Sequence, residues 1–280
     1  MSEFDRWMMV DWSAASAPTT GSNSIWIADT DATVGPGPIQ ARLDNPATRS
    51  AALELVSERI DEDRHQRVLL GIDASMSLPR SGIEALLGPG KSWPNLWNLI
   101  HHHVTDQANN RNNRFEAAAR INTLAGGPSG PFWGHPRGQV HPGLAATRPA
   151  MPWRGQAEEY RAAESLLRER GHNVQSTWKI AYPASVGGQF LMAIGWIRQL
   201  KQRHHNVFVW PLETGFSTRP APGDVWVAEV WPGEFELGAH HTIRDADQVL
   251  STVTALQGHD TAGRLGPWLG GPADPQLARQ

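Results

Sequence analysis

The stretches WMMVD at 7–11 and RVLLGID at 67–73 decide the fold of this 280-residue chain. Each is a short apolar run that ends in an aspartate, Asp11 in the first and Asp73 in the second. Runs of this kind predict buried β-strands. Because a carboxylate is costly to bury alone, each aspartate is either a turn residue or part of a shared site.

The residues between these two stretches predict how the strands are connected. SIWIA at 24–28 and IQARL at 39–43 indicate a second and a weaker third strand, which form an antiparallel meander with the first. Apolar residues at helical spacing over 45–63 predict a helix, with Asn45 as its N-cap and Pro46 at its first position. A right-handed crossover through this helix places the fourth strand beside the first and parallel to it.

Asp11 and Asp73 are therefore expected at the same edge of the sheet, on strands about 4.8 Å apart. Open α/β sheets bind their ligands at this edge. Two neighbouring carboxylates repel each other unless a cation lies between them, and hard oxygen ligands favour Mg²⁺ or Mn²⁺. We expect a metal site here, with Ser13 bonding the metal's water or a phosphate; turn hydrogen bonds are the alternative.

Composition limits the classes of function. Apolar residues make up 40% of the chain and charged residues 19%, which is typical of a globular protein, and cysteine is absent. There is therefore no disulfide framework, thiolate metal site or thiol nucleophile. No apolar run approaches the roughly 20 residues that span a bilayer, and MSEFDR at 1–6 does not resemble a signal peptide. We expect a cytoplasmic protein without a membrane partner.

The rest of the sequence favours one domain over 1–280 with an insertion at about 90–205. The insertion is rich in Trp, Asn, His and Gly, and helical patches alternate in it with loop-like segments. Two further strands are predicted within 206–215 and 224–235, and a last helix at about 245–265. No internal repeat or low-complexity linker divides the chain.

Several motifs carry a family resemblance. VDWSAAS at 10–16, together with GIDASMSLP at 71–79, resembles the predicted RNase H-like nucleases, a bacterial family with Asp-x-Ser on its first strand. VAEVWPGEF at 227–235 resembles a later strand of that family, and GHDTAGRL at 258–265 resembles its C-terminal helix. The middle of the chain resembles only a narrower group. Some relatives carry names from cobalamin or molybdopterin-guanine dinucleotide biosynthesis, which no residue here supports.

The resemblance implies an RNase H-like three-layer α/β fold with a mixed five-stranded sheet, in which an antiparallel meander precedes parallel strands. It also implies a carboxylate cluster, catalytic and metal-binding: Asp11, Asp73 and Glu229, with Asp260 as the further catalytic acid. Glu229 lies in an apolar strand, where a carboxylate is costly unless it is paired. Asp260 lies on the predicted last helix, where Asp245 and Asp247 are alternatives.

Further residues are candidates for substrate binding. Asn113 and Arg114 begin a predicted helix, and an arginine can offer a planar fork to a phosphate. Trp178 and Lys179 precede a segment, 185–189, that could open a helix with free amides facing an anion. Glu213 ends a predicted strand before a glycine turn. A purely structural role is the alternative for each.

The histidines are predicted to be surface or helix-end residues. The run at 101–103 lacks the i, i+4 spacing of a helical zinc pair, and 204–205 and 240–241 are adjacent pairs.

Together these features predict a metal-dependent phosphodiester hydrolase, a nuclease-like enzyme acting on nucleic acid or on a small phosphodiester. The net charge of −3 counts against long polymers, which are usually bound by a basic face. The alternatives are an actin-like or sugar-kinase-type nucleotide-dependent enzyme and a non-catalytic binding module that keeps the fold. A phosphate loop after the first strand is poorly supported, because 12–25 contains one glycine.

Overall fold

The structure, a computed structural model, describes residues 2–33, 40–127, 129–216 and 219–272. The chain divides into two compact units, each described here by itself. Of the described residues, the first unit comprises those within 2–74, 107–111 and 196–272, and the second comprises those within 75–106 and 112–195. The predicted insertion at about 90–205 falls largely in the second unit, which starts earlier in the chain, at Ser75.

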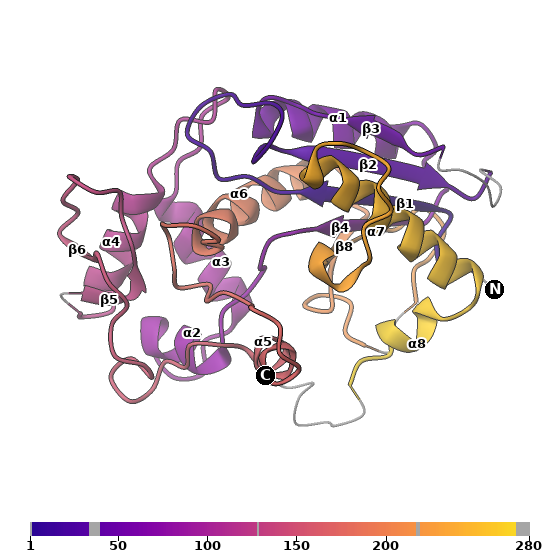
Figure 1. Cartoon of the computed structure of the whole chain (residues 1–280). Coiled ribbons are helices and arrows are strands. Elements are labelled where there is room, and N and C mark those ends of the chain that lie inside the picture. The colour runs from indigo at the N-terminus through magenta and orange to yellow at the C-terminus, as the bar shows by residue number, and fades with distance from the viewer. Residues whose placement is uncertain (1, 34–39, 128, 217–218, 273–280) are drawn as a thin grey trace. The chain divides into compact units, whose positions relative to one another are not determined.

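The first unit contains a six-stranded mixed sheet (Figure 1). In chain order its strands are β1 (Arg6–Asp11), β2 (Trp26–Asp31), β3 (Arg42–Asp44), β4 (Val68–Ile72), β7 (Val207–Trp210) and β8 (Val225–Glu229). Their order across the sheet is β3-β2-β1-β4-β8-β7. β1 to β3 are antiparallel, whereas β4 pairs parallel with β1 and β8, and β7 pairs parallel with β8.

The predicted meander and the parallel placement of β4 beside β1 are therefore confirmed. The sheet has six strands where the resemblance implies five, because β8 joins it next to β4 and β7 joins it beyond β8. β3 is shorter than the strand predicted at 39–43, whose first residue lies outside the described residues.

One face of this sheet packs against α7 (Arg244–Thr261) and α8 (Leu265–Leu269). Trp7 and Met9 of β1 are buried in a cluster with the apolar side of α7, including Val249 and Val253. Figure 1 shows α7 running along β1 and β2. Since alternate residues of a strand share a face, Asp11 lies on the same face of the sheet as Trp7 and Met9, the face that α7 covers.

The opposite face of the sheet is covered as well. Trp12, next in the alternation after Val10, is 1% exposed and its ring lies 5.2 Å from that of Trp196 in α6 (Gly187–Arg203). Trp196 donates its indole N–H to the carbonyl of Arg49 at 3.0 Å, which ties α6 to α1 (Arg49–Asp61). Helices therefore cover both faces of the sheet within this unit.

The start of α1 differs from the prediction. Thr48 is the N-cap, and its hydroxyl accepts from the Ala51 N–H at 3.1 Å. The amide of Asn45 is used elsewhere: it donates to the Ile25 carbonyl and accepts from the Gly21 N–H at 2.6 Å in each case. Asn45 therefore holds the β1–β2 loop and not the helix.

A network of ion pairs occupies the end of the sheet where β1 begins. Asp29 is 2% exposed and lies 2.5 Å from Arg42 and 3.8 Å from Arg6. Glu62 pairs with the same two arginines at 2.8 and 2.7 Å, and they lower the pKa of its carboxyl to about 2. The charges at this end of the sheet are thus paired.

The second unit is mainly helical. Its elements are α2 (Arg80–Leu87), α3 (Trp93–His103), α4 (Arg114–Leu124), the short parallel pair β5 (Ser129–Trp133) and β6 (Gly143–Ala145), α5 (Ala162–Glu169) and the first half of α6. The predicted helical patches correspond to α3, α4, α5 and α6, whereas α2 is not among them. Asn122 on α4 holds β5, because its amide exchanges hydrogen bonds with the Phe132 backbone at 2.9 and 3.0 Å.

Candidate functional site

Asp11 and Asp73 lie next to each other at the carboxyl ends of β1 and β4. The two strands are in parallel register, with Val10 opposite Ile72, and the Asp73 N–H continues the ladder by donating to the Val10 carbonyl at 2.9 Å. The side chains therefore meet at the edge where the sequence predicts them. Both are half-buried.

Tight packing holds β4 between its neighbours just before Asp73. A Cβ on Gly71 would lie 2.9 Å from the Met9 sulfur and 3.0 Å from Cγ2 of Val230. Only glycine leaves these two side chains room to close over the strand. The close approach of β1, β4 and β8 brings their ends together.

Both carboxyls have raised pKa values. Burial raises the pKa of Asp11 well above 3.8, and the nearby charges of Asp73 and Asp245 raise it further, although the backbone N–H of Trp12 opposes them. Burial, followed by the charge of Glu229, raises the pKa of Asp73 to about 7. Within the described part of the chain, no Lys, Arg or His forms an ion pair with Asp11 or Asp73. These carboxylates are thus desolvated and mutually repelled without a compensating cation.

Glu229 lies beside this pair but is oriented differently. It stands opposite Ile72 in the β4–β8 register, so strand alternation gives it the face of Ile72 and not the face of Asp11. Its side chain is exposed at the strand end, and it acts on Asp73 through charge. Glu229 is therefore a neighbour of the pair at the same edge.

Asp245 is the acid that α7 contributes to this edge. It lies in the first turn of α7, accepts the backbone N–H of Asn23 at 2.5 Å and raises the pKa of Asp11. From the sequence, Asp245 is expected only as an alternative to Asp260. Its signal was an acidic first turn in the helix that covers β1.

Asp260 does not lie at this edge, and the expectation that it completes the site is wrong. It is fully buried, and its carboxylate accepts from the backbone N–H groups of Glu3 and Phe4 at 2.7 and 2.8 Å and from the Trp7 indole at 3.2 Å. These groups precede or begin β1, whereas Asp11 ends it. Along α7, Asp260 is 15 residues from Asp245, or about 22 Å. Asp260 therefore anchors the start of β1.

Asp247, the other alternative, is also occupied by structure. Its carboxylate accepts from the backbone N–H groups of His240 at 2.6 Å and of Ala239 at 3.2 Å. It therefore orders the loop before α7.

The carboxylate oxygens of Asp11 and Asp73 are ligands of the kind that a hard divalent ion prefers. These two side chains are adjacent. Among the residues that the structure describes, no three or more His, Cys, Asp or Glu side chains are grouped closely enough to hold a metal ion. A cage of Asp11, Asp73 and Glu229 is therefore not assembled. Mg²⁺, however, is usually held by one or two carboxylates, with water and substrate oxygens completing its shell.

The two remaining candidates in the first unit make local contacts. The Ser13 hydroxyl accepts from the Ala15 N–H at 3.3 Å and donates to the Asn23 carbonyl at 3.4 Å, which orders the loop that follows Asp11. Glu213 pairs with Lys201 at 2.6 Å and accepts from the Val209 N–H at 2.8 Å. Glu213 therefore stabilises the turn after β7, and its expected role in substrate binding has no support.

Asn113 and Arg114 belong to the second unit, at the start of α4. Asn113 accepts from the Thr105 N–H at 2.7 Å and donates to the His103 carbonyl at 2.9 Å, so it fixes the connection between α3 and α4. The Arg114 guanidinium lies 4.4 Å above the Phe115 ring and lines a cavity of about 550 Å³. Arg137 also lines this cavity.

Trp178 and Lys179 do not form a binding surface. Trp178 is 0% exposed, donates to the Glu158 carbonyl at 2.9 Å and packs edge-on against Phe132, so it belongs to the core of the second unit. The Lys179 ammonium donates to the Pro183 carbonyl at 2.7 Å. The N–H of Gly187, which begins α6, already donates to the Lys179 carbonyl at 2.8 Å. The Gly187 N–H is thus already used within the protein.

Comparison with known proteins adds no relative: this chain matches none of the family models, curated proteins or solved structures compared. Of the helices described, none is long and apolar enough to cross a membrane.

Proposed function

We propose that this chain is a metal-dependent phosphodiester hydrolase of RNase H-like fold, in which Asp11 and Asp73 together bind Mg²⁺ or Mn²⁺. One observation carries the proposal: two half-buried carboxylates lie side by side on parallel strands, with raised pKa values and no cationic partner among the described residues. A divalent ion would relieve their repulsion. The order of the sheet, with β4 parallel to β1 after a meander, agrees with the fold that the sequence motifs imply.

In this proposal, residues of the chain bind the metal ion and orient it toward the substrate. Asp11 and Asp73 ionise and present their oxygens on the same edge of the sheet. Asp245, held by the Asn23 N–H, and Glu229 add negative charge around the pair without joining it. When bound, a divalent ion lowers the pKa of its water and neutralises phosphate charge. The remaining ligand positions are left to water and substrate, as two-carboxylate Mg²⁺ sites require.

The raised pKa values make metal binding depend on pH. Asp73, with a pKa of about 7, must lose its proton before it can act as a ligand. Metal affinity is therefore expected to rise from pH 6 to pH 8.

The test is calorimetric titration of Mn²⁺ and Mg²⁺ into the wild type and into Asp11→Asn and Asp73→Asn. Glu58→Gln, which changes an exposed acid on α1, is the matched control. We expect the wild type and the control to bind, and each Asp variant to lose binding at least roughly tenfold, as loss of one of two carboxylate ligands implies. Mn²⁺-dependent cleavage is then assayed on labelled DNA, RNA and cyclic dinucleotides. A wild type that binds no divalent ion at millimolar concentration would refute the mechanism.

A second function, a non-catalytic binding module that keeps the fold, is favoured by one observation. The described residues contain no group of three or more metal-ligating side chains. Such a module would bind ions weakly at Asp11 and Asp73 and cleave no phosphodiester. ATP turnover without phosphodiester cleavage would instead indicate the kinase-like alternative.

A further inference from the structure

The second unit contains a cavity of about 570 Å³ that the hydrolase proposal does not use. Its walls come from three segments: the end of α3, one side of α4 and the loop that carries His141. Ala117 and Ala119 of α4 lie in the lining, so small side chains leave room along that helix. The volume is in the range of sites for small ligands.

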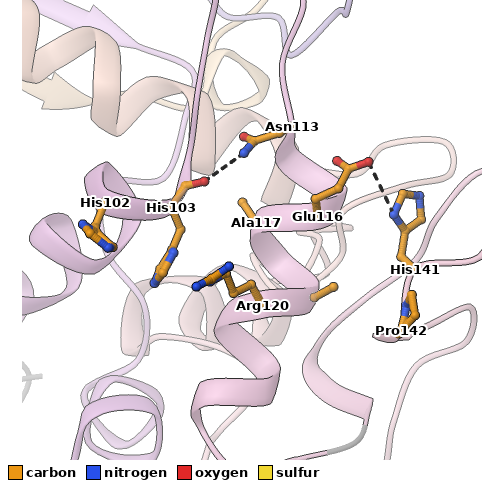
Figure 2. Close-up of a pocket in the computed structure, with 9 residues that line it drawn as sticks. His102, His103, Asn113, Glu116, Ala117, Arg120, His141 and Pro142 are labelled. Atoms are coloured by element: carbon orange, nitrogen blue, oxygen red, sulfur yellow. Dashed lines mark hydrogen bonds and ion pairs between the residues drawn. The ribbon is translucent and has the colours of Figure 1, made fainter.

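One arginine and two imidazoles line one side of this cavity. Figure 2 shows the Arg120 side chain reaching toward the ring of His103, with His102 on the other side of His103. The rings of His102 and His103 lie 4.8 Å apart. In the described ranges no Asp or Glu forms an ion pair with Arg120, His102 or His103. These three groups thus lack a compensating anion.

The acid in the lining is directed elsewhere. Glu116 lies 3.7 Å from Nδ1 of His141, and Figure 2 shows this pair on the far side of α4 from His103. The other ring nitrogen of His141 lies 3.0 Å from the Gln139 amide oxygen. Glu116 is therefore directed toward His141 and not toward Arg120.

We propose that this cavity binds a small phosphate ester, with its phosphate between Arg120 and His103. Arginine offers a planar fork of donors that matches phosphate oxygens, and a protonated imidazole adds a further donor. The cavity exceeds the size of a phosphate group, so the rest of the ester would lie against Ala117 and Pro142. This binding is independent of any metal at Asp11 and Asp73.

The pKa of His103 gives a way to detect a bound phosphate. Burial lowers it, and the positive charges of His102 and Arg120 lower it further. The other titratable groups that line the cavity are Glu116 and His141, which pair with each other. A bound phosphate reverses the local field, so we expect it to raise the pKa of His103. Binding of phosphate should therefore favour the protonated ring of His103.

The experiment titrates inorganic phosphate into the full chain with EDTA present, by calorimetry and by NMR of the histidine ring signals. Arg120→Gln and His103→Gln remove the proposed contacts, and both positions are near the surface. His101→Gln is the matched control, because His101 belongs to the same run of histidines and does not line the cavity. Circular dichroism verifies that each variant is folded, and Arg120→Lys tests for the planar fork.

We expect the wild type and His101→Gln to bind phosphate equally, and Arg120→Gln to bind at least roughly tenfold more weakly, as loss of a charge-assisted contact implies. Phosphate should raise the pKa of His103 and leave the ring signals of His101 in place. The proposal is overturned if Arg120→Gln binds as the wild type does, if His101→Gln loses as much affinity, or if the wild type does not respond to millimolar phosphate. Tighter binding of succinate than of phosphate would also overturn it.

Discussion

Replacement of Asp73 by asparagine should make the metal-free protein more stable at neutral pH. The pKa of this carboxyl is about 7 in the folded chain and 3.8 in its ordinary environment. A folded-state pKa that is raised means that the folded protein binds the proton more tightly than the unfolded chain. Stability is therefore unaffected below about pH 4 and falls as the pH rises toward 7.

The magnitude follows from the size of the difference. At about 1.4 kcal/mol for each pH unit, the ionised Asp73 lowers the free energy of unfolding by up to about 4 kcal/mol above pH 7. Asparagine has nearly the same shape and carries no charge. Asp73→Asn should thus match the wild type near pH 4 and gain stability progressively up to pH 8.

The assay is urea unfolding at pH 4, 6 and 8 with EDTA, repeated at pH 8 with Mn²⁺. Glu58→Gln, which removes an exposed carboxylate, should show no such rise. Mn²⁺ should stabilise the wild type and the control, because a ligand that binds only the folded state adds to stability, and should leave Asp73→Asn unchanged. Equal stability of Asp73→Asn and wild type at pH 8 without metal would refute the electrostatic reasoning, and equal stabilisation by Mn²⁺ would refute the site.

Four other substitutions test the packing and the ion pairs of the fold. Asp260→Asn should lower the free energy of unfolding, measured in urea, by about 2–3 kcal/mol, because buried donors lose a charged acceptor. Mn²⁺ binding should stay intact. Loss of metal binding without loss of stability would contradict the anchoring role. Glu62→Gln should lower the free energy of unfolding by about 1 kcal/mol at pH 7. Because the arginines lower the pKa of Glu62, this difference should disappear as the pH falls from 4.5 toward 2. An equal loss of stability at pH 2, measured by thermal unfolding, would contradict the prediction. Gly71→Ala should cost about 1–3 kcal/mol through overpacking against Met9 and Val230, whereas Gly195→Ala in α6, where a Cβ has open space, should gain about 0.5–1 kcal/mol; equal melting temperatures would disprove the packing argument.

The sequence predicts the half of the sheet that local patterns determine. Apolar runs and the crossover rule place Asp11 beside Asp73, because strand order and handedness follow from few physical constraints. The number of strands is harder to predict, since the pairing of β7 beyond β8 depends on contacts distant in the chain.

The candidate site is predicted less completely, because a motif does not reveal which partner a side chain meets. Asp260 matches the resemblance but bonds the backbone before β1, and Asp245 takes the position near Asp11. Trp178 lies among polar residues in the sequence and yet fills the core. The histidine run shows the same limit: its spacing excludes a zinc pair, but Arg120 approaches it from another helix.

The anchoring of β1 by Asp260 has a consequence for how the protein folds during synthesis. Phe4 and Asp260 are 256 residues apart, and the apolar face of β1 is covered by the same helix, α7. Until the ribosome has made that helix, Trp7 and Met9 remain exposed on a strand that is already outside the exit tunnel. Contacts of such long range are slow to form and leave apolar surface open to aggregation. β1 is therefore among the last strands of this sheet to be completed, although it is made before the others, and chains truncated before residue 244 should be captured by chaperones.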